Sequence, residues 1–82
     1  MMNAAARRVY LARENWKRTR SNALAAAADL LALAGTTDLA AYDKADLAAA
    51  EAAVAFQNAN LSLTKASIAY ADYMASRLVR GA

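Results

Sequence analysis

The chain contains no cysteine, no histidine and no proline, and its two glycines are Gly35 and Gly81. Without cysteine it can form neither a disulfide nor a thiolate metal site. Without histidine it lacks the commonest metal ligand and the commonest general acid or base. The absence of proline and the scarcity of glycine remove the residues that interrupt helices. These absences favour long helices and argue against histidine- or metal-dependent catalysis.

The chain also has little material for a core of its own. It has 82 residues, and alanine supplies 26 of them. Alanine is the best helix former, but it buries a single methyl group. A domain this small buries little of its apolar surface, and association with other chains is a usual remedy. The composition therefore predicts one helical domain, over residues 1–82, that depends on neighbours.

The acidic residues show no catalytic pattern. Asp43 and Asp46 lie close together in the sequence, but helix capping explains them. The chain has no glycine-rich phosphate loop, no nucleophile paired with a histidine, and no cluster of metal ligands. We therefore expect a non-enzymatic protein that uses no cofactor and no metal ion.

Hydrophobic periodicity predicts a first helix over about residues 3–34. Its apolar residues recur in steps of three and four, which is the spacing of a heptad seam. The seam consists of Val9, Ala12, Trp16, Thr19, Ala23, Ala26, Leu30 and Leu33. Gly35 follows at the position where a left-handed helix cap is needed, so a turn is expected over residues 35–38.

A second, longer helix is expected over about residues 39–80. It could start at Asp38, which offers an N-cap oxygen, or at Asp43, which opens a segment with the spacing of a capping box. Arg77 and Arg80 complement the helix dipole at the other end. A short connection between two long helices favours an antiparallel hairpin. The predicted fold class is all-α, a two-helix hairpin completed by packing against other chains.

Two apolar stripes run along this second helix. At about 100° per residue they lie roughly 160–200° apart around it. One stripe consists of Leu47, Val54, Leu61 and Ile68. The other contains Tyr42, Phe56, Leu63, Tyr70 and Tyr73. Two stripes predict two partners. We assign the Leu47 stripe to the hairpin core and the aromatic stripe to an interface between subunits, because aromatic side chains are favoured at interfaces.

A polar segment interrupts the second helix at its middle. It contains Gln57, Asn58, Asn60, Ser62 and Thr64. Polar residues at seam positions reduce stability but fix the register and the number of partners. The alternative is a ring of polar side chains that lines a channel. The sequence leaves both interpretations open.

Positive charge is concentrated near the N-terminus. The net charge is +3, and six of the ten basic residues lie within the first twenty. The candidate basic surface consists of Arg7, Arg13, Lys17, Arg18 and Arg20. Together with Trp16 these residues make a basic amphipathic helix. Such a helix can bind acidic residues of a neighbouring subunit or the phosphates of a nucleic acid. An anionic membrane surface is the third choice.

No segment of the chain has the length and apolar character of a membrane-spanning helix. Residues 23–34 have the composition of a signal-peptide core, but Asp29 interrupts them and a charged leader of 22 residues precedes them. We expect synthesis in the cytoplasm without a cleaved signal peptide, and a final location in a virion or an extracellular assembly.

These features predict a non-enzymatic structural subunit of a large repetitive assembly. Its expected partners are copies of itself and other assembly proteins. A small alanine-rich helical protein with a basic end suits a bacteriophage virion component, in a connector, a tail or an internal core beside packaged nucleic acid. One alternative is a small basic nucleic-acid-binding protein.

A second alternative is a subunit of a helical filament. In size and hairpin form the chain is similar to the needle subunits of type III secretion systems, through residues 39–42 after the turn and the polar residues 57–64. This resemblance implies hairpins packed around a channel. The chain departs from that family at its turn, where residues 35–38 replace a proline-containing turn, and in its basic N-terminal helix.

Overall fold

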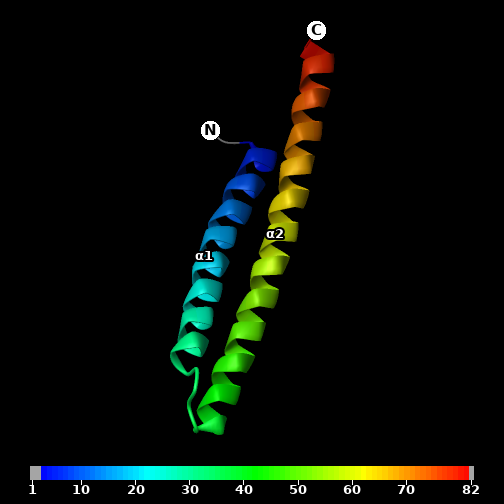
Figure 1. The fold of residues 1–82 in the computed structure, drawn as a ribbon. Coiled ribbons are helices and arrows are strands. Elements are labelled where there is room, and N and C mark those ends of the chain that lie inside the picture. Colours follow the sequence, from blue (N-terminus) through cyan, green and yellow to red (C-terminus); the bar gives the residue numbers. More distant parts are fainter. Residues whose placement is uncertain (1–2, 82) are drawn as a thin grey trace.

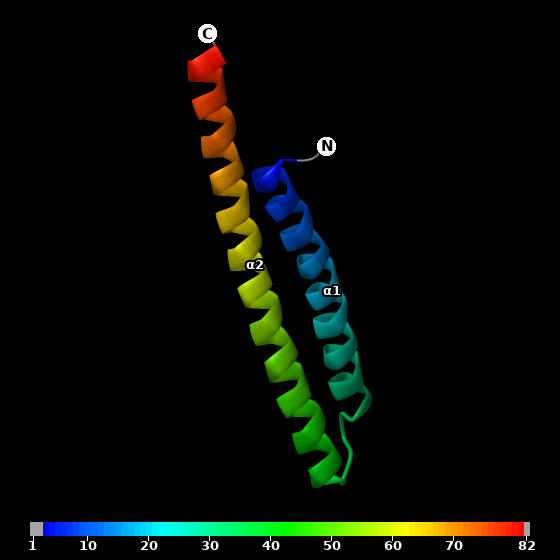
Figure 2. The same ribbon diagram turned by 180° about the vertical axis from the view of Figure 1, so that it is seen from behind.

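The fold is an all-α antiparallel hairpin, as predicted. The computed structural model describes residues 3–81, so residues 1, 2 and 82 of the predicted domain lie outside the described residues. Helix α1 (Ala4–Ala32) and helix α2 (Leu39–Gly81) run side by side in opposite directions (Figure 1, Figure 2). Both helices begin and end within two residues of the predicted bounds.

Helix α1 is capped at both ends by the residues next to it. Asn3 accepts a hydrogen bond from the amide of Ala6 through its side-chain oxygen at 2.8 Å, which satisfies one of the free amides of the first turn. At the other end Gly35 has a φ of +81°, the left-handed conformation that side chains disfavour. The C-cap of α1 is Leu33, whose amide donates to the carbonyl of Leu30, and Gly35 lies in the turn two residues beyond it. The left-handed glycine after α1 is therefore confirmed, but its predicted role as the cap is not.

Helix α2 starts after Asp38. The side chain of Asp38 accepts a hydrogen bond from the amide of Ala41 at 3.1 Å, and its carbonyl accepts one from the amide of Tyr42 at 3.1 Å. The helix continues without interruption through Asp43. The alternative start at Asp43 is therefore wrong, because Asp38 already satisfies the first free amides of the helix.

The hairpin is a long, thin molecule. Its extents are 68 × 19 × 13 Å, and its radius of gyration is 18.8 Å. A compact chain of this length has a radius of gyration of roughly 12 Å. Helix α2 extends well beyond the start of α1 (Figure 1). Among the residues whose burial is described, only Ala59 is buried, with 1% of its surface exposed.

The two helices meet along what we call the inner seam, a row of half-buried residues on each helix that also includes the buried Ala59. The α1 row contains the eight residues predicted from its periodicity, Val9 to Leu33, all of them half-buried. The α2 row is Ala41, Ala45, Ala49, Ala52, Phe56, Ala59, Leu63, Ala66, Tyr70 and Tyr73. Six of these ten residues are alanine. Small side chains allow two helices to approach closely, so the seam is narrow and buries little surface.

Trp16 fixes the register of the two helices. Its ring packs against Phe56 with the ring centroids 5.8 Å apart, and its indole Nε1 donates a hydrogen bond to the side-chain oxygen of Asn60. Ala59 lies between these two contacts on α2 and is the most buried residue. The large ring of Trp16 thus lies where α2 presents a methyl group, which leaves room for it.

Candidate interaction surfaces

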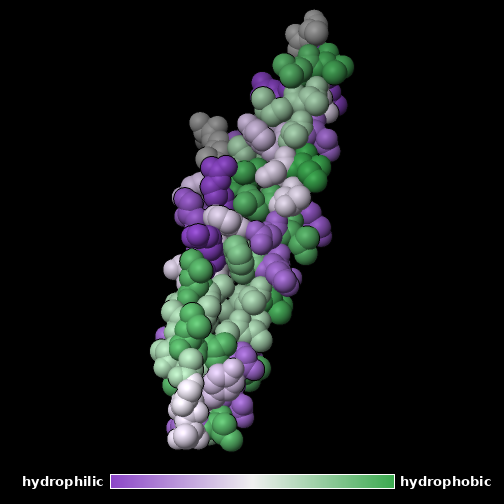
Figure 3. Space-filling view, viewed as in Figure 1, coloured by the Kyte–Doolittle hydropathy of each residue, from purple (hydrophilic) through white to green (hydrophobic). Residues whose placement is uncertain are grey.

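The most conspicuous surface is a row of large apolar side chains on α2 that face away from α1. We call it the outer stripe: Leu47, Val54, Leu61 and Ile68, which are 55–61% exposed. Hydrophobic side chains recur along the edge of α2 that is farther from α1 (Figure 3). The inner seam lies about 180° around α2 from this stripe, at about 100° per residue. The hairpin therefore leaves its bulkiest aliphatic row in solvent.

This arrangement reverses the assignment of the two stripes made from the sequence. Phe56 and Leu63 lie in the inner seam, whereas Leu61 lies on the exposed outer stripe. The prediction that the outer stripe forms the hairpin core is therefore wrong. The physical reason is the size of Trp16, which packs against Phe56 and bonds Asn60 on the alanine-rich side of α2, where the backbones can approach.

The other aromatic residues predicted for a subunit interface have mixed environments. Tyr42 is exposed, whereas Tyr70 and Tyr73 are half-buried in the inner seam. Tyr73 lies in the part of α2 near the start of α1, and its hydroxyl accepts a hydrogen bond from the guanidinium of Arg77 at 3.4 Å. The same guanidinium lies 5.9 Å from the Tyr73 ring centroid. Tyr42 is thus the member of this set that is most available to another subunit.

The predicted basic residues are all exposed on α1. They are Arg7, Arg13, Lys17, Arg18 and Arg20. Lys17 contacts Glu14 at 3.3 Å, which is the one ion pair within residues 3–81. Arg18 donates a hydrogen bond to the side-chain oxygen of Asn15 at 2.8 Å. Most of this positive charge is therefore presented to solvent, where it can meet a partner.

The hairpin topology separates positive from negative charge along the long axis of the molecule. This separation is not evident from the basic cluster near the N-terminus alone. We call residues 22–57 the turn end and the rest of the described chain the open end. The open end has nine basic and two acidic residues, a net charge of +7, and the turn end has one basic and five acidic residues, a net charge of −4. Hydrophilic side chains gather over the upper half of α1 (Figure 3). Each hairpin is thus an extended molecule with ends of opposite sign.

The polar segment of α2 is divided between two directions around the helix. At about 100° per residue, Gln57, Asn60 and Thr64 lie within about 60° of one another, whereas Asn58 and Ser62 point about 100–140° away from Gln57. Asn60 faces α1 and bonds Trp16, and the hydroxyl of Thr64 donates to the Asn60 carbonyl at 2.9 Å. Gln57 is exposed. The hydrogen bond to Trp16 gives Asn60 a register-fixing role within the hairpin. A channel lining would require the side of α2 that carries Gln57 and Thr64 to face a common axis in several copies.

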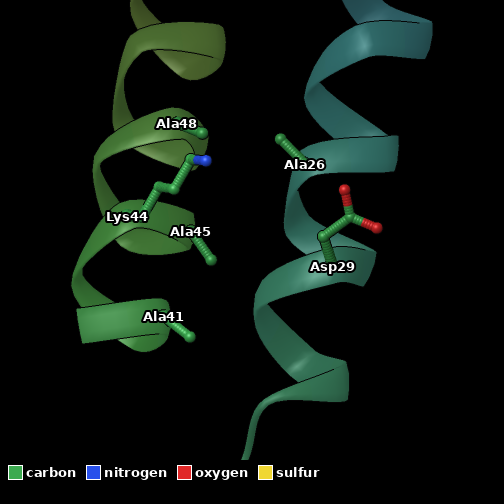
Figure 4. Close-up of a pocket in the computed structure, with 6 residues that line it drawn as sticks. All are labelled: Ala26, Asp29, Ala41, Lys44, Ala45 and Ala48. Atoms are coloured by element: carbon green, nitrogen blue, oxygen red, sulfur yellow. The ribbon is translucent and has the colours of Figure 1, made fainter. Parts of the chain in front are cut away.

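A shallow groove of about 280 Å³ lies between the helices near the turn. It is lined by Ala26, Asp29, Ala41, Lys44, Ala45 and Ala48. Figure 4 shows Asp29 on α1 and Lys44 on α2, with alanine methyl groups between the helices. The groove is open because alanine fills little volume. Its lining offers one carboxylate and one ammonium group on apolar walls, which suits a side chain of another protein.

The described helices offer neither a membrane span nor a metal site. Neither α1 nor α2 contains a stretch that is both long enough and apolar enough to cross a membrane. Within residues 3–81, no three acidic side chains come together in a way that could hold a metal ion. Comparisons with protein-family profiles, curated proteins and solved structures find no match.

Proposed function

We propose that the chain is a non-enzymatic structural subunit of a large repetitive assembly, built from copies of itself and other proteins. The observation that supports this proposal most strongly is the outer stripe. Four large aliphatic side chains, each more than half exposed, stand in one row on the side of α2 opposite α1. A continuous apolar row of this kind marks a surface that another protein covers.

The exposed area suggests more than one interface for each chain. The surface of the hairpin measures 6332 Å². A compact protein of the same mass exposes roughly 4,700 Å², so the hairpin exposes roughly 1,600 Å² more. A protein–protein interface of standard size covers roughly 800 Å² on each partner. Two such interfaces would bring the chain to the exposure of an ordinary globular protein, and two different interfaces generate rings or helical arrays.

Within this class we favour a bacteriophage virion component, such as a part of a connector, a tail or an internal core. The charged open end supports this choice, because nine basic residues near one end suit contact with packaged nucleic acid. The location would then be the virion. A needle-like helical filament outside the cell is the alternative supported by the thin hairpin shape.

A small nucleic-acid-binding protein is the second candidate function. The same open end favours it, since phosphate contacts supply most of the affinity of such proteins. One hairpin presents six basic residues along α1, so its binding would be weak and sensitive to salt unless many copies act together. This candidate predicts a small oligomer, whereas the structural proposal predicts a large one.

The first prediction concerns the size of the protein in solution. We expect the isolated chain at micromolar concentration to sediment as a multimer, because the monomer leaves the outer stripe in water. Sedimentation velocity over a hundredfold concentration range measures this directly. A cooperative, compact monomer at every concentration would contradict the proposed function.

The second prediction concerns the basic surface of α1. We expect the triple substitution Arg13→Gln, Lys17→Gln and Arg20→Gln to weaken assembly roughly tenfold, the combined effect of a few exposed ion pairs. The expected partners are acidic residues at the turn end of a neighbouring subunit, such as Asp43 and Asp46. Sizing at two salt concentrations, beside a titration with duplex DNA, provides the measurement.

A matched control for this triple variant removes charge elsewhere at the open end. Lys65→Gln, Arg77→Gln and Arg80→Gln change α2 instead of α1, so they separate a local effect from a loss of net charge. Intact assembly in the α1 variant would oppose our expectation. If its DNA affinity also fell, with a salt slope smaller by up to about 0.9 for each lost phosphate contact, the nucleic-acid function would be favoured.

A further inference from the structure

The outer face of α2 has the pattern of a complete helix-pairing seam. Each residue of the outer stripe is followed three residues later by a smaller or polar one, and the two sets alternate in steps of three and four. The residues that follow the stripe are Ala50, Gln57, Thr64 and Ala71, all exposed. No part of α1 reaches this face, because α1 lies on the opposite side of α2 (Figure 1).

A row of charges borders this seam on one flank. Its members are Lys44, Glu51, Asn58, Lys65 and Asp72, spaced by seven residues. Each member is exposed, and none of the four charges belongs to an ion pair within residues 3–81. From Lys44 to Asp72 the signs are plus, minus, neutral, plus and minus. Read in the opposite direction, from Asp72 to Lys44, the row has the opposite sign at each of its four charged positions.

We propose that the outer face of α2 binds a second copy of the chain in the antiparallel orientation, with Asn58 near the two-fold axis. In an antiparallel pair of facing helices, the same flank of each helix lies on the same side of the interface. The charged row of one copy then faces the same row of the other, read in reverse. Glu51 lies level with Lys65 of the second copy, and Lys44 lies level with Asp72 of the second copy.

The seam residues support nearly the same register. An axis one residue beyond Asn58 sets Leu47 level with Ala71 of the second copy and Ile68 level with Ala50 of the second copy. Toward both ends of the pair large residues therefore face small ones, which fills the space between two helices without strain, whereas at its middle Val54 lies level with Thr64 and Leu61 with Gln57. The two α2 helices overlap over almost their whole length, about 60 Å at about 1.5 Å per residue.

The long-range charge distribution favours the same orientation. An antiparallel pair places the acidic turn end of one hairpin beside the basic open end of the other, whereas a parallel pair places ends of like charge together. A parallel pair also brings opposite flanks of the two helices together. Asp46 of one copy would then approach Glu51 of the other, which is a repulsive contact.

This inference rests on the proposed function, since it names the first interface of the assembly. It is tested with Glu51→Lys and Lys65→Glu, made singly, together in one chain, and as a mixture of the two single variants. Both positions are exposed, so circular dichroism should show unchanged helicity. We expect each single variant to self-associate on the order of tenfold more weakly at low salt, because two attractive pairs per dimer become repulsive.

The double variant and the mixture identify the pairing. The double variant restores opposite charges across the two-fold axis and should recover the original dimerisation constant. Mixed one to one, the single variants should form a heterodimer, in which every Glu51 site and Lys65 site again faces an opposite charge. Native mass spectrometry distinguishes the heterodimer from the homodimers if the variants carry different isotopes.

Orientation is read independently from a label at Ser76. Because the chain has no cysteine, Ser76→Cys provides a single attachment site. The antiparallel pair separates the two labels by about 50 Å, at about 1.5 Å per residue, and a parallel pair keeps them much closer. A spin-label distance measurement on the dimer makes this distinction.

The outcomes separate this inference from the proposed function. A multimer that is unaffected by the charge reversals, or whose Ser76 labels lie close together, overturns the antiparallel pairing and leaves the assembly function intact. A chain that stays monomeric at all concentrations overturns both. Association only after another protein is added overturns self-pairing through α2.

Discussion

Leu63→Asp is expected to disrupt the hairpin, whereas Leu61→Asp is expected to leave it folded and to abolish assembly. Leu63 is half-buried in the inner seam, and a carboxylate placed there loses hydration without gaining a partner. The expected loss of stability is about 2–4 kcal/mol, which is a large share of the roughly 5 kcal/mol that a small domain has. Leu61 is 59% exposed, so its carboxylate remains hydrated in the single hairpin.

These two variants form a matched pair, because they place the same charge two residues apart on one helix. Circular dichroism at low protein concentration reports the hairpin, and sedimentation at high concentration reports assembly. Association itself stabilises the folded state, so the melting temperatures must be compared at one concentration. Greater loss of helicity in Leu61→Asp than in Leu63→Asp would show that the outer stripe forms the hairpin core. Equal loss in both would remove the distinction between the two faces.

Much of this fold follows from sequence periodicity. The eight-residue seam of α1 was predictable because Trp16, Leu30 and Leu33 stand out from an alanine background at heptad spacing. The turn was predictable because Gly35 is the one interior glycine, and it takes a positive φ within the turn that follows the Leu33 cap. Polar caps at Asn3 and Asp38 then define where the two helices begin.

The face of α2 that contacts α1 was not predictable from hydropathy. The outer stripe contains larger aliphatic residues than the alanine row around Ala59, so burial of apolar area alone favours the wrong face. The deciding factor is the contact of Trp16 on one helix with Phe56 and Asn60 on the other, which depends on both helices at once. A possible signal was Phe56, the one phenylalanine of the chain, which packs against its one tryptophan.

The charged surface was predictable only in part. The basic cluster of residues 7–20 is visible in the sequence, but the contribution of Arg77 and Arg80 to the same end of the molecule depends on the antiparallel topology. The acids from Asp29 to Glu51 gather at the turn end for the same reason. Because the chain folds back on itself, the basic residues from both termini gather at the open end, and the acidic residues gather at the turn end.

The contact made by Trp16 leads to the second large expected effect. Trp16→Ala should destabilise the hairpin by about 3 kcal/mol, because it removes the largest side chain of the inner seam and leaves a space above Ala59 that the helices cannot close completely. Helicity at room temperature should fall, and the melting temperature at fixed concentration should drop steeply. Leu24→Ala is a suitable control, since Leu24 is 56% exposed on the same helix and should change stability by less than about 0.5 kcal/mol.

Two smaller substitutions divide the effect of Trp16 into its parts. Trp16→Phe keeps an aromatic ring beside Phe56 but removes the Nε1 donor to Asn60, and Asn60→Ala removes the acceptor instead. Each should reduce stability by about 1 kcal/mol, the usual net value of one hydrogen bond. The double variant should lose no more than the larger single loss, because both changes remove the same bond. Additive losses in urea melts would show that Trp16 and Asn60 act independently. The register of α1 against α2 would then be set by the packing of Trp16 against Phe56 alone.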